Sequence, residues 1–158
     1  MHEELSRLSQ DVHGLAYRLH PNVLEDLGLG DALRSECERV SKGQGLSVDW
    51  HIDALPAGIA AAVTVCVFRV AQEALRNIVR HAEARSARVS LAMKDGGLQL
   101  LVTDDGVGFE PRIGHSAGLG IASMRERVRE VGGKFSFRSK PGAGTTVLAW
   151  VPVVAANE

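Results

Sequence analysis

The sequence is poor in several features that mark specialised classes of protein. Aromatic residues make up 4% of its 158 residues, and cysteine occurs only twice. Cys37 and Cys66 lie in helical patterns among apolar or small neighbours, without the C-x-x-C spacing of redox and metal motifs. We therefore expect both to be core thiols in a protein of a reducing compartment.

The chain also lacks an excess of charge of one sign and a long apolar run. Its 18 basic and 19 acidic residues give a net charge of −1, so there is no basic field to hold nucleic acid or an anionic membrane. The longest stretch of low charge, residues 54–68, is too short and too rich in alanine to span a bilayer, and no signal peptide is recognisable. These absences predict a cytoplasmic fragment without nucleic-acid or direct membrane contact, although its parent could be membrane-anchored.

What the chain does contain suits one domain with a substantial core, since 45% of its residues are hydrophobic and 23% are charged. The hydrophobic patterns predict an α+β fold: a two-layer sandwich of a mixed five-stranded sheet with about three helices on one face, preceded by another helix. In the first strand, Trp50 is expected in the core and His51 in water. Strands are expected at residues 46–52, 86–94, 98–104, 134–139 and 145–153. A short helical turn with glycine punctuation is expected at residues 21–30, and longer helices at residues 31–41, at residues 56–82 and from Gly118 onward.

Residues 1–19 carry apolar side chains at alternating spacings of three and four, which is the heptad seam of a helix ended by Pro21. A single helix of this length is marginally stable, so the seam needs a partner. That partner is either another helix, outside this chain or in a second subunit, or the core of the domain itself. The seam consists of Leu5, Leu8, Val12, Leu15 and Leu19.

A buried strand that ends in an acidic, glycine-rich turn is the first candidate for chemistry. Asp104-Asp105-Gly106-Val107-Gly108 follows the apolar run 98–103 and forms a D-x-G-x-G pattern. An ionised Asp104 can only accept hydrogen bonds, which suits an exocyclic amine such as that of adenine. The two glycines allow a ligand to approach the backbone closely.

A second glycine pair, Gly118-Leu119-Gly120, opens a segment with apolar residues at helical spacing. The unpaired N–H groups and the dipole at a helix start attract phosphates. Together the two motifs predict a nucleotide site, whereas either motif alone is more often an ordinary turn.

The helix expected at residues 56–82 is apolar over most of its circumference, with one narrow polar stripe. Asn77 offers a neutral oxygen and Glu73, one turn earlier, a carboxylate, which suits a magnesium ion held mostly by water and phosphate. Arg80 and His81 at the far end could meet phosphate oxygens. The stripe, formed by Arg69, Glu73, Asn77 and Arg80, is equally compatible with a solvated face held by ion pairs.

The three motifs stand together in a specific order and resemble the N box and the two glycine boxes of sensor histidine kinases, whose ATP-binding domain has the Bergerat fold of gyrases and MutL proteins. The resemblance covers nearly the whole chain and is strongest to the nitrate-sensor-like and desaturase-regulator-like kinases with a short ATP lid. It is carried by Gln72-Glu73-Ala74-Leu75-Arg76-Asn77-Ile78-Val79-Arg80-His81-Ala82, Asp104-Asp105-Gly106-Val107-Gly108-Phe109, Gly118-Leu119-Gly120-Ile121 and Ser139-Lys140-Pro141-Gly142-Ala143-Gly144-Thr145-Thr146.

The resemblance implies a role for each matching residue. Asp104 would bind the adenine amine, Asn77 would bind Mg²⁺, and Glu73 would hold a metal-bound water or polarise a nucleophile. Arg80 and His81 would approach the phosphates, although the family more often has lysine at the position of Arg80.

The glycine boxes would frame the ATP site and hinge a short lid at residues 110–117. Thr145 or Thr146 would lie near the base or a water bound to it. The glycine-box residues concerned are Gly106, Gly108, Gly118, Leu119 and Gly120.

The resemblance also divides the chain. Residues 1–20 correspond to the second helix of a dimerisation hairpin, 21–45 to a connector and first helix, 46–154 to the catalytic core and 155–158 to a tail. The first hairpin helix, which carries the phosphoacceptor histidine, has no match here. The implied partners are that missing helix, a response regulator and a second copy in the full-length homodimer, and we expect this chain alone to bind ATP without phosphorylating itself.

Two other functions remain open at this point. An anti-sigma factor of the same fold would use ATP to phosphorylate a serine, and a degenerate module would keep the fold as a binding or dimerisation platform without turnover. The seam and Leu19-His20-Pro21 favour the sensor kinase, and the presence of Glu73, Asn77 and Asp104 argues against degeneration.

Overall fold

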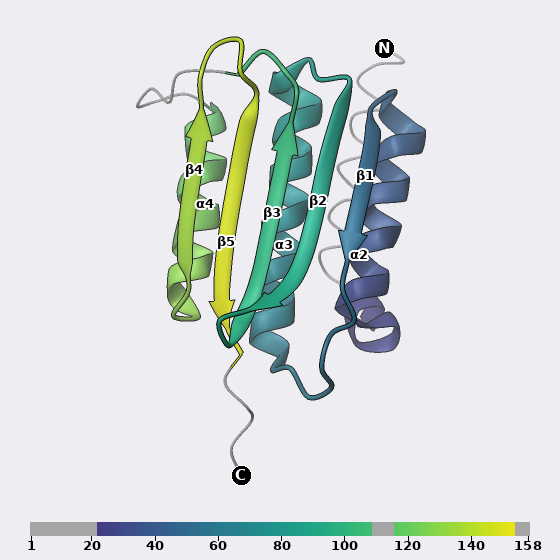
Figure 1. The fold of residues 1–158 in the computed structure, drawn as a ribbon, viewed down its shortest axis with the longest axis vertical. Helices are drawn as coiled ribbons and strands as arrows, with labels where there is room; N and C mark the ends of the chain where they lie inside the picture. Colours follow the sequence, from purple (N-terminus) through teal and green to yellow (C-terminus); the bar gives the residue numbers. More distant parts are fainter. Residues whose placement is uncertain (1–21, 109–115, 154–158) are drawn as a thin grey trace, which may run out of the picture.

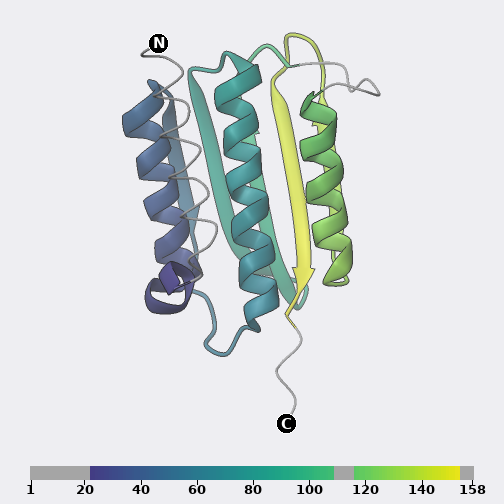
Figure 2. The same cartoon turned by 180° about the vertical axis from the view of Figure 1, so that it is seen from behind.

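The computed structural model describes residues 22–108 and 116–153. In this part of the chain a five-stranded sheet, ordered β1-β2-β3-β5-β4, is covered by three helices on one face only (Figures 1 and 2). The predicted two-layer α+β sandwich is therefore confirmed. The elements are α2 (Asn22–Gln44), β1 (Ser47–Ile52), α3 (Ala61–Asn77), the π-helical η1 (Ile78–Ala82), β2 (Ser86–Lys94), β3 (Gly97–Asp104), α4 (Ser116–Glu130), β4 (Lys134–Ser139) and β5 (Thr145–Pro152).

The sheet is mixed because a helix connects its first two strands, whereas β2–β3 and β4–β5 are hairpins and α4 lies between β3 and β4 in the chain. β1 and β2 are parallel, with α3 as the crossover between them, and all other neighbours are antiparallel. In the register of the sheet, Thr145 on β5 lies opposite both Asp104 on β3 and Ser139 on β4. Side chains at paired positions point to the same face, so these three residues form a row across neighbouring strands.

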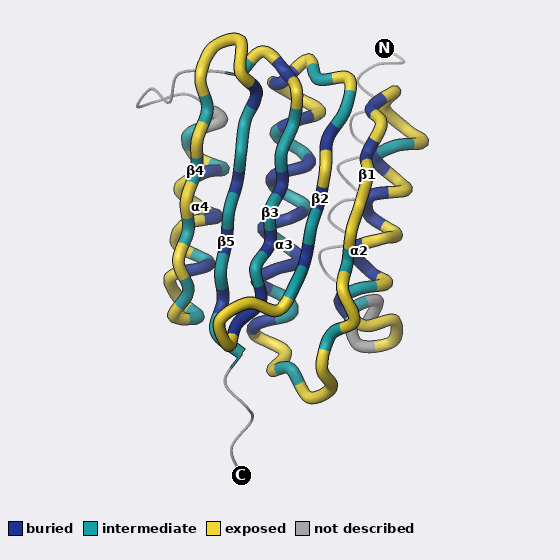
Figure 3. Tube along the Cα trace, in the orientation of Figure 1, coloured by how far each residue is buried: buried dark blue, intermediate teal, exposed yellow. Residues whose placement is uncertain are grey.

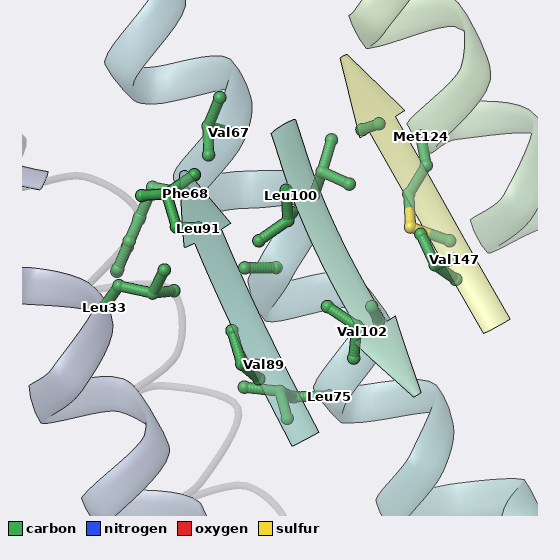
Figure 4. Packing of buried hydrophobic residues seen from close by; sticks show 14 of the residues in the cluster. Leu33, Val67, Phe68, Leu75, Val89, Leu91, Leu100, Val102, Met124 and Val147 are labelled. Carbon is green, nitrogen blue, oxygen red and sulfur yellow. The ribbon is translucent and has the colours of Figure 1, made fainter. Parts of the chain in front are cut away.

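The core lies between the sheet and the three helices. Alternate residues on the central strands, such as Val89, Leu100 and Val147, are at most 4% exposed and pack against α3 and its neighbours (Figures 3 and 4). Cys37 and Cys66 are buried and free, as expected. Burial raises the pKa of Cys37 to about 12 and that of Cys66 to about 11, so both remain protonated thiols.

The sequence prediction was wrong at two points, the start of the central helix and the burial of Trp50. The central helix begins at Ala61 rather than residue 56, because residues 57–58 form a turn after Pro56. The short helical turn expected at residues 21–30 and the helix expected at residues 31–41 are both present within α2, separated by a kink at Gly28 (φ 79°). Trp50 is 37% exposed on the edge strand rather than buried, whereas His51 is exposed as expected.

Several predictions fall on residues outside the described part of the chain. They include the helix and its seam at residues 1–19, residues 110–115 of the lid and the tail. The domain boundaries at residues 20, 45 and 154 stay predictions. None of the helices within residues 22–108 and 116–153 is long and apolar enough to cross a membrane.

Candidate functional site

The predicted site residues meet at one end of the sheet, the upper end in Figure 1. α3 and η1 end there, β3 and β4 end there, and β5 and α4 begin there. The fold thus gathers the polar stripe, both glycine motifs and the threonines, although they lie far apart in sequence.

The second glycine motif lies directly against the polar stripe of α3. A Cβ atom built on Gly120 would lie 2.5 Å from Glu73 Oε1 and 3.3 Å from Asn77 Nδ2. The first distance is shorter than real Cβ contacts, so a side chain at this position would require the Glu73 carboxylate to move. Glu73 and Asn77 are half-buried. A carboxylate, an amide and the first turns of a helix therefore share one small region.

Asp104 has one satisfied and one unsatisfied carboxylate oxygen. Oδ1 accepts a hydrogen bond of 2.8 Å from the backbone N–H of Gly106. Oδ2 is buried and has no hydrogen-bond partner. Burial raises the pKa of Asp104, and the backbone N–H groups of Gly106 and Thr145 partly oppose this rise. A buried acceptor without a partner costs stability, which is the pattern expected of a ligand contact.

Asp105, the next residue, has a different role that the sequence analysis did not foresee. Its Oδ1 accepts hydrogen bonds of 3.0 Å from the backbone N–H groups of Arg85 and Ser86, and its Oδ2 accepts one of 2.9 Å from Ser86 Oγ. These donors lower the pKa of the Asp105 carboxyl. Asp105 thus ties the end of β3 to the start of β2. Only its position as a second acidic residue before glycine could have signalled such a turn-forming role.

The D-x-G-x-G loop is fixed between two other segments. The N–H of Val107 donates to the carbonyl of Ala82 at the end of η1, and the carbonyl of Val107 accepts from the N–H of Gly142 in the β4–β5 loop. Gly108 has a φ of +64°, and a Cβ atom there would collide with the carbonyl of Lys140. Glycine is therefore required at this position for both conformation and space.

The remaining predicted residues are placed as follows. Arg80 and His81 are exposed on η1, and Leu119 is 76% exposed in the first turns of α4. Thr145 faces the helices, as do its partner Asp104 and the buried Val147 two residues on, so Thr146 points to the opposite face of the sheet. Of the two threonines, only Thr145 stands beside Asp104.

The Asp104 carboxyl should cost the unliganded protein stability near neutral pH. Its pKa is raised in the folded state, so the folded protein binds more protons than the unfolded chain, and stability falls as pH rises above the ordinary value of 3.8. Asp104→Asn keeps an oxygen for the Gly106 N–H and cannot ionise. We expect it to raise the Tm of the unliganded protein at pH 7, with a smaller difference at pH 4, measured by calorimetric melts. An equal Tm at pH 7 would contradict the burial of an ionised carboxylate.

The sequence also matches the model of a known protein family over the segments that form this site. The model for histidine kinase-, DNA gyrase B- and HSP90-like ATPases matches residues 63–155, which include most of α3, both glycine motifs and β5. The chain belongs to this ATPase family. The resemblance inferred from the motifs is therefore confirmed.

The curated relatives of this ATPase domain are sensor kinases. The chain is 35% identical to the oxygen sensor histidine kinase NreB of Staphylococcus carnosus over 94% of its own length and 43% of that protein. It is 38% identical to the histidine-protein kinase/phosphatase UhpB of Salmonella typhimurium over 86% of this chain and 27% of UhpB. The sensor histidine kinase LiaS of Bacillus subtilis is 34% identical over 90% of this chain and 39% of LiaS. The chain thus spans less than half the length of each of these relatives.

Solved structures share the fold of the ATPase domain. The histidine kinase domain of a blue-light activated kinase from Erythrobacter litoralis superposes with a TM-score of 0.63 at 20% identity, covering 80% of this chain and 60% of that domain. Full-length ShkA, solved in complex with AMPPNP, gives a TM-score of 0.66 at 21% identity and covers 99% of this chain and 40% of ShkA.

Proposed function

We propose that this chain is the ATP-binding catalytic domain of a two-component sensor histidine kinase. It would transfer the γ-phosphoryl group of Mg-ATP to a histidine on a dimerisation helix not present in this chain, for onward transfer to a response regulator. The proposal depends on one observation: the buried Oδ2 of Asp104 has no hydrogen-bond partner. It lies at the end of the sheet where the first glycine motif contacts η1 and the second contacts α3.

At the base, Asp104 would accept a hydrogen bond from the adenine amine through Oδ2. Burial makes this acceptor selective, because a base that offers no donor leaves the oxygen unsatisfied. Gly106 and Gly108 hold the adjoining backbone without side chains in the way. The phosphates would lie toward the first turns of α4, where Gly120 lies beside Asn77, with Arg80 and His81 on η1 as hydrogen-bond donors.

The residues present fit a magnesium ion that is held mainly by the nucleotide. No group of three or more His, Cys, Asp and Glu side chains within the described residues could hold a metal ion unaided. Asn77 would contribute its amide oxygen and Glu73 would hold a metal-bound water, which suits an ion that keeps several waters and phosphate ligands. When bound, Mg²⁺ neutralises charge on the phosphates during transfer.

In the transfer step, the protein contributes mostly position and charge. Glu73, beside Asn77, would orient the incoming imidazole or accept a hydrogen bond from it. The helix dipole of α4 and the glycine backbone would stabilise negative charge on the phosphates.

A variant without the Asn77 amide should separate the contribution of the metal to ATP affinity from that of the adenine base. We expect Asn77→Ala to weaken ATP binding about tenfold in the presence of Mg²⁺ and to change it little in excess EDTA, because the loss concerns only the metal contact. Calorimetric titrations in both buffers measure this. Gln72→Ala, at a half-buried polar position on the same helix outside the stripe, is the control and should behave as wild type. Equal losses with and without Mg²⁺ would remove Asn77 from the metal site.

The kinase activity is tested by supplying the missing acceptor. The chain alone, incubated with γ-labelled ATP, should take up no label. A separately made dimerisation hairpin of the parent protein should acquire acid-labile phosphohistidine when the chain is added, and not when the Asn77→Ala variant is added. Acid-labile label on the chain alone, lost in His2→Gln or His13→Gln, would show that the acceptor lies within this chain.

The same experiment distinguishes the two alternatives. Acid-stable phosphoserine on a partner would favour an anti-sigma-type serine kinase, and tight ATP binding with no transfer to any hairpin would favour a binding module. Either result would overturn the histidine kinase assignment while leaving the nucleotide site intact.

A further inference from the structure

A second hydroxyl group stands next to Thr145 and has no role in the function proposed above. Ser139, at the end of β4, lies opposite Thr145 in the sheet, and its Oγ is 3.0 Å from Thr145 Oγ1. Asp104 lies opposite Thr145 on its other side. Paired positions across antiparallel strands bring side chains within about 5 Å of one another. The buried carboxylate and the two hydroxyls therefore follow one another on the face of the sheet that carries the helices.

The two hydrogen bonds of Ser139 determine which hydroxyl group in this row donates and which accepts. Ser139 Oγ is also 3.3 Å from the carbonyl oxygen of Gly144, which can only accept. A serine hydroxyl has a single proton. Both bonds form at once only when Ser139 donates to Gly144 and Thr145 donates to Ser139. In that arrangement the proton of Thr145 points away from Asp104, and Thr145 Oγ1 offers lone pairs on the side of the base.

We infer that Ser139 is a positioning residue for purine selectivity: it holds the Thr145 hydroxyl as an acceptor beside the carboxylate of Asp104. This inference rests on the nucleotide-binding function proposed above. Two neighbouring acceptors favour the 6-amino group of adenine, which donates, over the 6-oxo group of hypoxanthine or guanine, which accepts. Without Ser139, the Thr145 hydroxyl could rotate and donate to a 6-oxo group.

The selectivity is measured with the triphosphates of adenosine and inosine, which differ at this edge of the base. Competition against a fluorescent ATP analogue gives the ratio of the two dissociation constants. The wild type should prefer ATP strongly. We expect Ser139→Ala to reduce the ATP-to-ITP preference about five- to tenfold, the effect of one hydrogen bond that changes direction. Ser139→Thr keeps the hydroxyl and should restore most of the preference.

Two further variants separate positioning from general damage to the fold. Ser136→Ala, three residues earlier on β4 and on the exposed face of the sheet, should leave the ratio unchanged. Thr145→Val removes the hydroxyl on which Ser139 acts, so adding Ser139→Ala to it should not change the ratio further. Thermal melts identify any variant that is not folded at the assay temperature.

Several outcomes would overturn the inference. It fails when folded Ser139→Ala keeps the wild-type ratio, when Ser136→Ala lowers the ratio equally, or when Ser139→Ala acts as strongly in the Thr145→Val background. A failure of the proposed function is different: the wild type would then bind neither triphosphate, or Asp104→Ala would bind ATP as wild type does. Tight ATP binding that depends on Asp104, with a ratio insensitive to Ser139, removes only the role of Ser139.

Discussion

Asp104→Ala is expected to abolish measurable ATP binding, with an affinity loss of about 100-fold or more. The variant removes the only carboxylate whose buried oxygen, among the described residues, lacks a partner. It leaves the adenine amine without its carboxylate acceptor, and sites built to hydrogen-bond a group discriminate strongly when the bond is missing. Isothermal calorimetry at neutral pH with Mg-ATP measures the loss.

The neighbouring carboxylate provides the control. Asp105→Ala breaks three hydrogen bonds to Arg85 and Ser86. It should lower the Tm while the folded fraction still binds ATP. The low pKa of Asp105 adds stability above pH 3.8 that is lost as pH falls further, so the difference between wild type and variant should narrow in acid. ATP binding that is lost equally in both alanine variants would contradict the assignment of Asp104 to the base.

Gly108→Ala is expected to lower the free energy of unfolding by about 3 kcal/mol or more, which corresponds to a drop in Tm of about 10 °C or more. The added methyl group combines a left-handed backbone, at φ +64°, with a collision against the Lys140 carbonyl. The β4–β5 loop would have to move away from the D-x-G-x-G loop, so ATP binding should weaken as well. Thermal and urea unfolding measure the loss of stability.

A second glycine in the same region isolates the steric part of this effect. Gly142 has a φ of +82° but open space around its Cβ position. Gly142→Ala should therefore cost only about 1 kcal/mol, the conformational penalty alone. If the two variants were equally destabilised, the collision with the Lys140 carbonyl would contribute nothing to the loss of stability in Gly108→Ala.

Much of the fold and site could be predicted because several local signals agreed. Alternating apolar residues, apolar runs and glycine-containing turns together located all five strands of the described sheet. The motifs were informative in combination: Gly120 proves to lie against Glu73 and Asn77, a closeness that neither motif specifies alone.

The errors concern features that depend on tertiary context. Trp50 has the correct alternation for the core, but it lies on β1, the edge strand of the sheet within the described residues, which pairs with a strand on one side only. Pro56 is a good first residue for a helix, yet α3 begins five residues later at Ala61. The hydrogen bonds of Asp105 and Ser139 depend on residues that are distant in sequence or on sheet register, so no local pattern reveals them.

The hydrogen bonds that join Ala82, Val107 and Gly142 have a consequence for the thermodynamics of ligand binding. They connect the end of η1, the D-x-G-x-G loop and the β4–β5 loop through the backbone alone. The conformational entropy of these segments is therefore lost when the protein folds and not when a ligand arrives. A site ordered in this way binds the adenine base with a smaller entropic penalty. The affinity for the base should therefore depend little on side-chain changes in the β4–β5 loop that leave the loop backbone in place.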